Sequence, residues 1–155
     1  MEVITKMTEI SNSTRPLPDI NDELYAPYFQ ALQNNMLVVQ QCEKCGHWQW
    51  PAREFCFYCH CTRLGWREIK QNGFIYTYTV VYRAFHPWFK NCLPYGIVIV
   101  ELEKGIRMLG NYFGSDVESL ECGMPMKAAF EKVHDEITVL NWVKDHQKIS
   151  KTKNG

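Results

Sequence analysis

Two Cys-x-x-Cys hooks constrain the fold of this chain more than any other feature of its sequence. Cys42 and Cys45 form the first hook, and Cys56 and Cys59 form the second after ten intervening residues. Each hook lets two thiolates converge on one metal ion, and two hooks complete a closed tetrahedral site. Gly46 follows the first hook directly, where a tight turn favours a residue that tolerates positive φ. The spacing therefore predicts a structural zinc ion held by these four cysteines.

The second hook leaves alternatives open. His60 and Cys61 follow Cys59 directly, and each competes with it for the fourth ligand position, although the regular spacing favours Cys59. The same pair of hooks also binds iron in electron carriers of the rubredoxin kind. Four buried cysteines that share this spacing by chance are the remaining alternative. A colourless protein would indicate zinc, and a red one would indicate iron.

The rest of the sequence favours a reduced, cytoplasmic setting for these thiols. The first 13 residues lack the continuous apolar segment of a signal peptide. No run approaches the roughly 18 apolar residues of a membrane span. We therefore expect a cytoplasmic protein whose seven cysteines serve as ligands or free thiols and not as disulfides.

The N-terminal part of the chain predicts an arm followed by a helix. Residues 1–20 are polar, contain two prolines and show no periodicity, which is typical of an extended arm. Residues 21–36 begin with acidic side chains and place Pro27 in the first turn, with Phe29 and Leu32 three residues apart. This pattern predicts a short amphipathic helix that needs an apolar surface to lie on.

The remaining sequence predicts a mainly β protein. Residues 37–70 contain the hooks and no helical period, so we expect a zinc ribbon there. Between residues 71 and 143, five segments are rich in aromatic or β-branched side chains and are separated by turns: 74–82, 95–102, 106–113, 126–133 and 137–143. Five strands with one wider gap favour a small closed barrel of the OB type, with a plain β-sandwich as the alternative. Residues 144–155 are lysine-rich and predict a disordered tail.

No catalytic residue is predicted. The sequence has no phosphate-binding loop, nucleophile elbow, zinc-protease helix or dinucleotide fingerprint. Cys92 and Cys122 lie outside the ribbon, and the spacing of six residues between His86 and Cys92 does not define a nucleophile and its base.

Charge argues against nucleic acid as a partner, although ribbons and OB barrels often bind single strands by stacking on aromatic side chains. The chain has 17 basic and 17 acidic residues and thus no net charge. A nucleic-acid groove needs an excess of Lys and Arg. The barrel segments instead carry several acids, namely Glu101, Glu103, Glu118, Glu121, Glu131, Asp135 and Glu136.

The segment between the first two barrel strands is unusual in composition. Phe85, Trp88 and Phe89 lie between the cations Arg83 and Lys90 in a stretch too irregular for a strand. Exposed aromatic side chains beside Arg are typical of interface anchors. The alternative is a loop that folds back and plugs the end of the barrel.

Several segments of the chain share their order and motifs with one known family. They are Pro27-Tyr28-Phe29-Gln30-Ala31-Leu32, Cys42-x-x-Cys45-Gly46, Pro51-Ala52-Arg53 before Cys56-x-x-Cys59, Gly73-Phe74-Ile75-Tyr76-Thr77-Tyr78-Thr79-Val80-Val81, Pro94-Tyr95-Gly96-Ile97-Val98, Glu101-Leu102-Glu103-Lys104-Gly105 and Gly123-Met124-Pro125-Met126. From about residue 24 to residue 143 the chain resembles the acyl-CoA-associated zinc-ribbon and OB-fold family. The pair His60-Cys61 departs from the small or polar residue usual in that family.

The resemblance implies a rubredoxin-like zinc ribbon, an OB barrel and a non-catalytic role. Members of the family accompany thiolases, or less often hydratases and aldolases, as subunits of a hetero-oligomer that binds CoA thioesters. We expect a thiolase-type partner, with Arg53, Arg83, Phe85, Trp88 and Lys90 as contacts to CoA or to that partner. The aromatic loop is compatible with a bulky aromatic acyl-CoA from the degradation of aromatic compounds. A single-stranded nucleic-acid-binding OB-fold protein is the alternative function.

Overall fold

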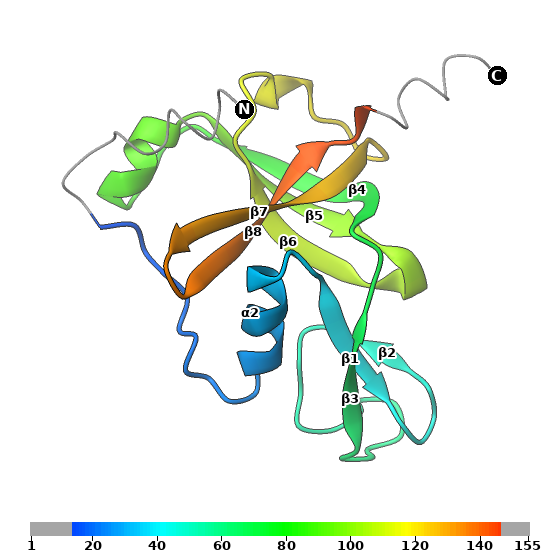
Figure 1. The fold of residues 1–155 in the computed structure, drawn as a ribbon. Helices are drawn as coiled ribbons and strands as arrows, with labels where there is room; N and C mark the ends of the chain where they lie inside the picture. The colour runs from blue at the N-terminus through cyan, green and yellow to red at the C-terminus, as the bar shows by residue number, and fades with distance from the viewer. Residues whose placement is uncertain (1–13, 147–155) are drawn as a thin grey trace.

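The computed structural model describes residues 14–146 and shows a helix, a small ribbon and a barrel (Figure 1). The remainder of the predicted arm, residues 1–13, and of the predicted tail, residues 147–155, lies outside the described residues. Within the described range, no helix has the length and apolar character needed to cross a bilayer.

The helix α2 spans Ala26–Gln33 and is shorter than the predicted 21–36. Before it, the carboxylates of Asp19 and Asp22 each accept a hydrogen bond from the backbone amide two residues further on. Such bonds favour turns over helix, which explains the late start. The helix ends before Asn35, whose φ of +56° is a left-handed conformation common at helix C-termini.

The ribbon is a three-stranded antiparallel sheet of order β2-β1-β3. Its central strand β1 (Val38–Cys42) pairs with β2 (Trp48–Gln49) and with β3 (Leu64–Glu68). The first hook occupies the β1–β2 turn, and the second lies in the loop from β2 to β3. Both hooks are therefore at the same end of the ribbon.

The second sheet is a closed barrel of order β4-β5-β6-β8-β7. Its strands are β4 (Asn72–Val81), β5 (Tyr95–Glu101), β6 (Arg107–Tyr112), β7 (Pro125–His134) and β8 (Ile137–Lys144). β6 and β8 pair in parallel, and the other neighbouring strands pair antiparallel. The closed five-stranded barrel confirms the predicted OB architecture and excludes the open sandwich.

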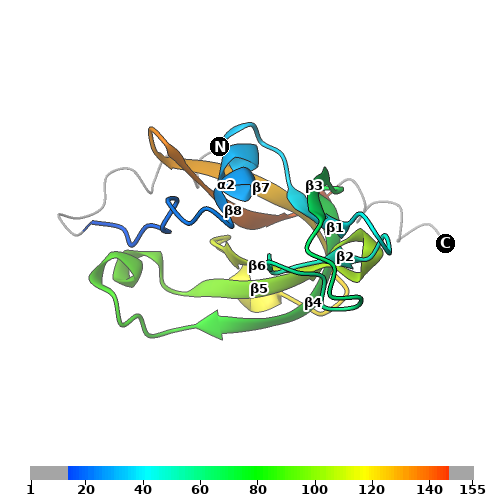
Figure 2. The same cartoon turned by 90° about the horizontal axis from the view of Figure 1, so that it is seen from below.

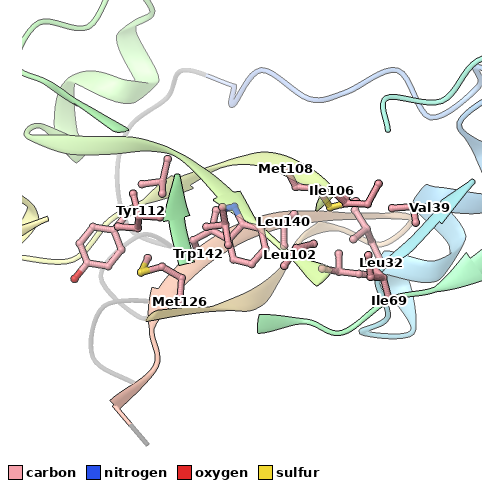
Figure 3. Close-up of a cluster of buried hydrophobic side chains, with 14 of the residues drawn as sticks. Leu32, Val39, Ile69, Leu102, Ile106, Met108, Tyr112, Met126, Leu140 and Trp142 are labelled. Carbon is pink, nitrogen blue, oxygen red and sulfur yellow. The ribbon is translucent and has the colours of Figure 1, made fainter. Parts of the chain in front are cut away.

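One hydrophobic core joins the three parts of the fold (Figure 3). The barrel contributes Trp142, which is fully buried, while α2 contributes Leu32. Val39 of β1 and Ile69, directly after β3, belong to the same cluster. The base of the ribbon is thus part of the barrel core, whereas the metal hooks project beyond it (Figure 1).

The barrel extends to Lys144, the residue at which the predicted tail begins. The side chain of Lys144 is only 8% exposed, and its Nζ lies 2.5 Å from Asp116 Oδ2 and 2.7 Å from Ser119 Oγ. Tyr112 donates its hydroxyl hydrogen bond to the same Asp116 carboxylate. A buried ammonium is tolerated when it is paired and hydrogen-bonded, and this network fixes the end of β8.

This network predicts a specific loss of stability in acid. The ammonium of Lys144, followed by the hydroxyl of Tyr112, lowers the pKa of Asp116 from its ordinary value of 3.8. The pKa of Asp116 is lower in the folded than in the unfolded chain, so its ion pair with Lys144 stabilises the folded protein above about pH 4. This stabilisation is lost as the pH falls through the lowered pKa of the folded state. Lys144→Met should therefore unfold at lower urea concentration than the native chain at pH 7, and the two midpoints should approach each other below about pH 3. A constant difference in midpoint across this range would contradict the assignment.

Candidate metal centre and interaction surfaces

The four predicted cysteines converge on one point in space. The Sγ atoms of Cys42, Cys45, Cys56 and Cys59 all lie within 4.8 Å of one another. The Sγ atoms of Cys42 and Cys59 are 3.6 Å apart, and those of Cys45 and Cys56 are 3.7 Å apart. A tetrahedral zinc ion with bonds of about 2.3 Å requires sulfur–sulfur separations of about 3.8 Å. The donor set and its spacing fit zinc, with every coordination position filled by protein.

Backbone amides and neighbouring thiols control the ionisation of this centre. The N–H of Cys45 lowers the pKa of Cys42 to about 6, against the effect of burial. The N–H of Cys61 also lowers the pKa of Cys59, but burial and three neighbouring thiols outweigh it and raise that pKa to about 12. Four thiolates do not form together without a cation, because like charges at this distance repel. A bound divalent ion supplies the missing charge.

The structure selects Cys59 over its two neighbours as the fourth member of the cluster. Cys61 is not a member of the cluster, and its Sγ accepts a hydrogen bond from the backbone N–H of Arg63 at 3.4 Å. His60 has a left-handed backbone with φ of +58°, and its ring lies 6.2 Å from that of Phe55. The hook at Cys56 and Cys59 therefore keeps the regular spacing.

Two buried glutamines, which sequence reasoning missed, position the loop that carries the second hook. Gln40 on β1 exchanges two hydrogen bonds with the backbone of Arg53, at 2.8 and 3.0 Å. Gln49 on β2 donates to Gln40 Oε1 at 3.0 Å and to the carbonyl of Phe55 at 3.2 Å, and it accepts from Phe57 N–H at 3.2 Å. Both side chains are almost fully buried. The sequence signal that could have identified them is the presence of a glutamine in each of the two short strands that flank the first hook.

Aromatic side chains surround the metal hooks and remain exposed. His47 stacks on Tyr58 with a centroid separation of 5.5 Å and meets Phe57 edge to face at 4.7 Å. Phe55, Phe57 and Tyr58 are 47%, 57% and 72% exposed. An apolar surface of this kind beside a rigid metal centre is suited to contact with another protein.

The predicted aromatic loop divides into an exposed part and a folded-back part. The 3₁₀ helix η1 (Pro87–Cys92) holds Trp88 and Phe89, both half-buried. Phe89 stacks on the buried Tyr95 with centroids 5.2 Å apart, so it covers this end of the barrel. Phe85, before the helix, is 96% exposed. The interface interpretation thus fits Phe85, and the plug interpretation fits Phe89.

The predicted cationic contacts do not meet in one place. Arg53 lies in the ribbon, while Arg83 precedes η1 and Lys90 lies within it, and both of these side chains are exposed. Figure 1 places the ribbon and η1 at opposite ends of the molecule, joined through β4. An extended strand of this length spans about 30 Å. The two groups of cations therefore mark separate surfaces.

A cleft of about 680 Å³ opens where the ribbon meets the barrel. Its charged lining residues are three acids and two lysines, namely Glu68, Glu103, Asp145, Lys70 and Lys127. Lys70 is paired with Glu103 at 3.4 Å. The excess of acids makes this cleft unsuited to the phosphates of a nucleotide.

Cys92 has the surroundings of a structural thiol. Its Sγ faces the carbonyl of Trp88, and burial raises the pKa of the thiol. A raised pKa disfavours the thiolate, which is the nucleophilic form.

Comparisons with known proteins agree with this architecture. A family model described as the rubredoxin-like zinc ribbon domain of ChsH2 matches residues 29–64, and one described as the C-terminal OB-fold domain of ChsH2 matches residues 66–131. A DUF35 domain-containing scaffold protein of Methanocaldococcus jannaschii is 34% identical over 102 residues, which cover 64% of this chain and 71% of that protein. A scaffold protein of the same description from Methanothermobacter thermautotrophicus is 33% identical over 107 residues, covering 67% and 78% of the two chains.

A longer relative and two solved structures extend the comparison. A probable enoyl-CoA hydratase alpha subunit of Thermomonospora curvata is 31% identical over 138 residues; these are 87% of this chain but only 42% of that protein. The structure named Ltp2-ChsH2(DUF35) aldolase superposes with a TM-score of 0.73 and 29% identity, over 82% of this chain and 98% of the other. A DUF35-family protein of unknown function from Sulfolobus solfataricus shares the fold, with a TM-score of 0.56 and 19% identity over 82% and 89% of the chains.

Proposed function

Because this chain belongs to the family of ChsH2 and DUF35 domain-containing scaffold proteins, we propose that it is a non-catalytic accessory subunit of an enzyme complex that processes acyl-CoA thioesters. Two relatives support this role through their names, one a probable enoyl-CoA hydratase alpha subunit and one an Ltp2-ChsH2(DUF35) aldolase. This chain would assemble the complex and help to bind the CoA part of the substrate.

One observation carries the proposal: the metal centre is closed and stands beside exposed aromatic side chains. Four protein thiols fill the tetrahedral positions, so no position remains for a water molecule or a substrate. Such a centre stabilises a fold and presents a surface, here Phe55, Phe57 and Tyr58. These properties suit a subunit that binds another protein.

We further propose a thiolase-type catalytic subunit as the partner in a hetero-oligomer, acting on an aromatic acyl-CoA. The sequence resemblance supports the thiolase, and the aromatic content of the ribbon and of residues 83–90 supports the substrate class. In the complex, the exposed cations Arg83 and Lys90 would face the phosphates of CoA, because guanidinium and ammonium groups bind phosphate well. The partner would supply all reacting groups.

Isolation of the complex tests this function. The tagged chain is purified from its native host, and stoichiometric partners are identified by mass and then produced with and without this chain. A partner that converts acyl-CoA only in the presence of this chain supports the proposal, and CoA-dependent thiolysis by that partner identifies a thiolase. Turnover by this chain alone, or a salt-dependent shift of a labelled oligonucleotide at physiological ionic strength, would overturn it.

Phe85 is the residue whose loss should weaken the complex most selectively. Its side chain is 96% exposed and contributes little to the fold, so Phe85→Ser should leave thermal stability unchanged. Buried aromatic anchors at interfaces are worth about 2 kcal/mol or more, so partner affinity should fall roughly 10- to 100-fold.

Leu109 provides the matched control for Phe85. It is 62% exposed on the outer face of β6, and Leu109→Ser should leave partner affinity unchanged. Titration of the purified partner with each variant measures both effects. A larger loss of partner affinity for Leu109→Ser than for Phe85→Ser would indicate that the partner binds the outer face of the barrel and not the segment at Phe85.

A further inference from the structure

A buried arginine in the N-terminal arm contacts the barrel far along the chain. Arg15 Nη1 donates to Glu131 Oε1 at 2.6 Å, and the two side chains are only 13% and 16% exposed. Burying two charges is costly unless the geometry is good and the remaining polar atoms are satisfied. The surroundings of this pair therefore determine whether it is a surface contact or a formed pocket.

Trp88 provides one wall of a pocket for the guanidinium group. Its ring lies beneath Arg15, with 4.4 Å between Cζ and the ring centroid. A planar guanidinium stacks on an indole and still directs its N–H groups outward in the plane, which an ammonium does not do. The cation is thus held between η1 on one side and β7 on the other.

Asn141 on β8 fixes the carboxylate that binds the cation. Its Nδ2 donates to Glu131 Oε2 at 2.6 Å, so one carboxylate oxygen of Glu131 accepts from Asn141 and the other accepts from Arg15. Asn141 is only 8% exposed, and its Oδ1 has no hydrogen-bond donor among the residues that the structure describes. A carboxylate aligned by a buried amide is a preorganised acceptor for a cation.

The pocket lies on the side of the barrel that carries two of the loops that OB folds use for ligand binding. That side is bordered by the loop between the first two strands, which contains η1 here, and by the loop between the last two, the β7–β8 turn. Figure 2 shows the arm, in dark blue, running between η1 and the β7–β8 hairpin. The contacts of Arg15 with Glu131 and Trp88 hold the arm in this position.

We propose that Trp88, Glu131 and Asn141 form a guanidinium-binding pocket between η1 and the strands β7 and β8, with Arg15 of the same chain as its resident ligand. A tethered ligand has a high effective concentration, so Arg15 keeps the pocket occupied in the isolated subunit. The pocket selects a planar cation by stacking and by one aligned carboxylate. This inference does not depend on the acyl-CoA role.

Chemical rescue tests the pocket in the full-length chain. Arg15→Gly should lower the thermal midpoint by several degrees, and millimolar ethylguanidinium should restore most of the loss. Ethylammonium carries the same charge but has no planar group, so at equal concentration it should restore much less of the thermal midpoint. In Arg15→Gly combined with Glu131→Gln, ethylguanidinium should have no stabilising effect. Equal responses to the two cations, or no response to either, would overturn the proposal.

A second measurement needs no change at Arg15. In the native chain, the Nε–H resonance of Arg15 should be shifted upfield by the Trp88 ring and should exchange slowly with water. Trp88→Leu should remove the ring shift, and Glu131→Gln should accelerate the exchange. An Nε–H resonance at the position of a solvated arginine in the native chain would show that the pocket is empty in solution and would overturn the assignment.

Discussion

Replacing Cys56 by serine is expected to release the metal and unfold the hooks of the ribbon while the barrel stays folded. Cys56 is fully buried, and its Sγ lies 3.7 Å from that of Cys45. Metal binding contributes about 10–16 kcal/mol in small structural zinc sites, and loss of one thiolate removes most of it. The loop from residue 50 to 63 has no regular secondary structure to replace that contribution.

The barrel should survive because its core does not include the hooks. Val39 and Ile69 at the base of the ribbon pack with the barrel cluster (Figure 3), whereas none of the four metal-binding cysteines belongs to that cluster. We therefore expect Cys56→Ser, or treatment of the native chain with a chelator, to add an early transition at low temperature and leave the main one close to its native position. Metal content by elemental analysis and thermal unfolding measure the two events.

Cys61 provides the matched control for this experiment. Its thiol lies outside the cluster, so Cys61→Ser should keep one zinc ion per chain and the native melting curve. A native melting curve after complete metal loss from the Cys56 variant would refute the structural role. If the purified protein were red and contained iron, the same four cysteines would bind iron and not zinc.

The features that could be predicted from the sequence are those encoded by neighbouring residues. The hooks follow from spacing alone, because two residues between cysteines bring their sulfurs together whatever the rest of the chain does. The barrel strands follow from β-branched and aromatic runs between turns, and all five begin and end within two residues of the predicted positions, such as β5 at Glu101 against 102. The short α2 differs more, because side chains of Asp19 and Asp22 compete for backbone amides.

The features that could not be predicted depend on contacts between distant residues. Lys144 appears in the sequence as the first residue of a lysine-rich tail, and only the fold brings Asp116 to it. Gln40 and Gln49 become anchors for the second hook because β1 and β2 pair side by side. Arg15 reaches Glu131 over 116 positions in the chain, a contact that no local pattern encodes.

Replacing Trp142 by alanine should strongly destabilise the barrel and leave the metal hooks intact, whereas Cys56→Ser should unfold the hooks and leave the barrel folded. Trp142 is fully buried on β8, and it packs closely on Gly110 of β6. A Cβ added at Gly110 would lie 2.7 Å from Trp142 Cδ1, so the indole fills all the space that the glycine leaves. Truncation of a buried Trp costs about 3–5 kcal/mol through lost burial and the cavity left behind. That is a large part of the stability of about 5–15 kcal/mol typical of a protein domain.

Trp142→Phe separates the packing effect from the polar one. The buried indole Nε1 has no hydrogen-bond acceptor within the described part of the chain, so phenylalanine removes an unpaired donor while keeping most of the apolar volume. Its loss of stability in urea should therefore be well below that of alanine. Both variants should still bind one zinc ion at low temperature, because the hooks lie outside the core that Trp142 organises. Equal losses for the two variants would contradict the packing account, because phenylalanine keeps most of the apolar volume. Simultaneous loss of zinc would mean that ribbon and barrel unfold as one unit.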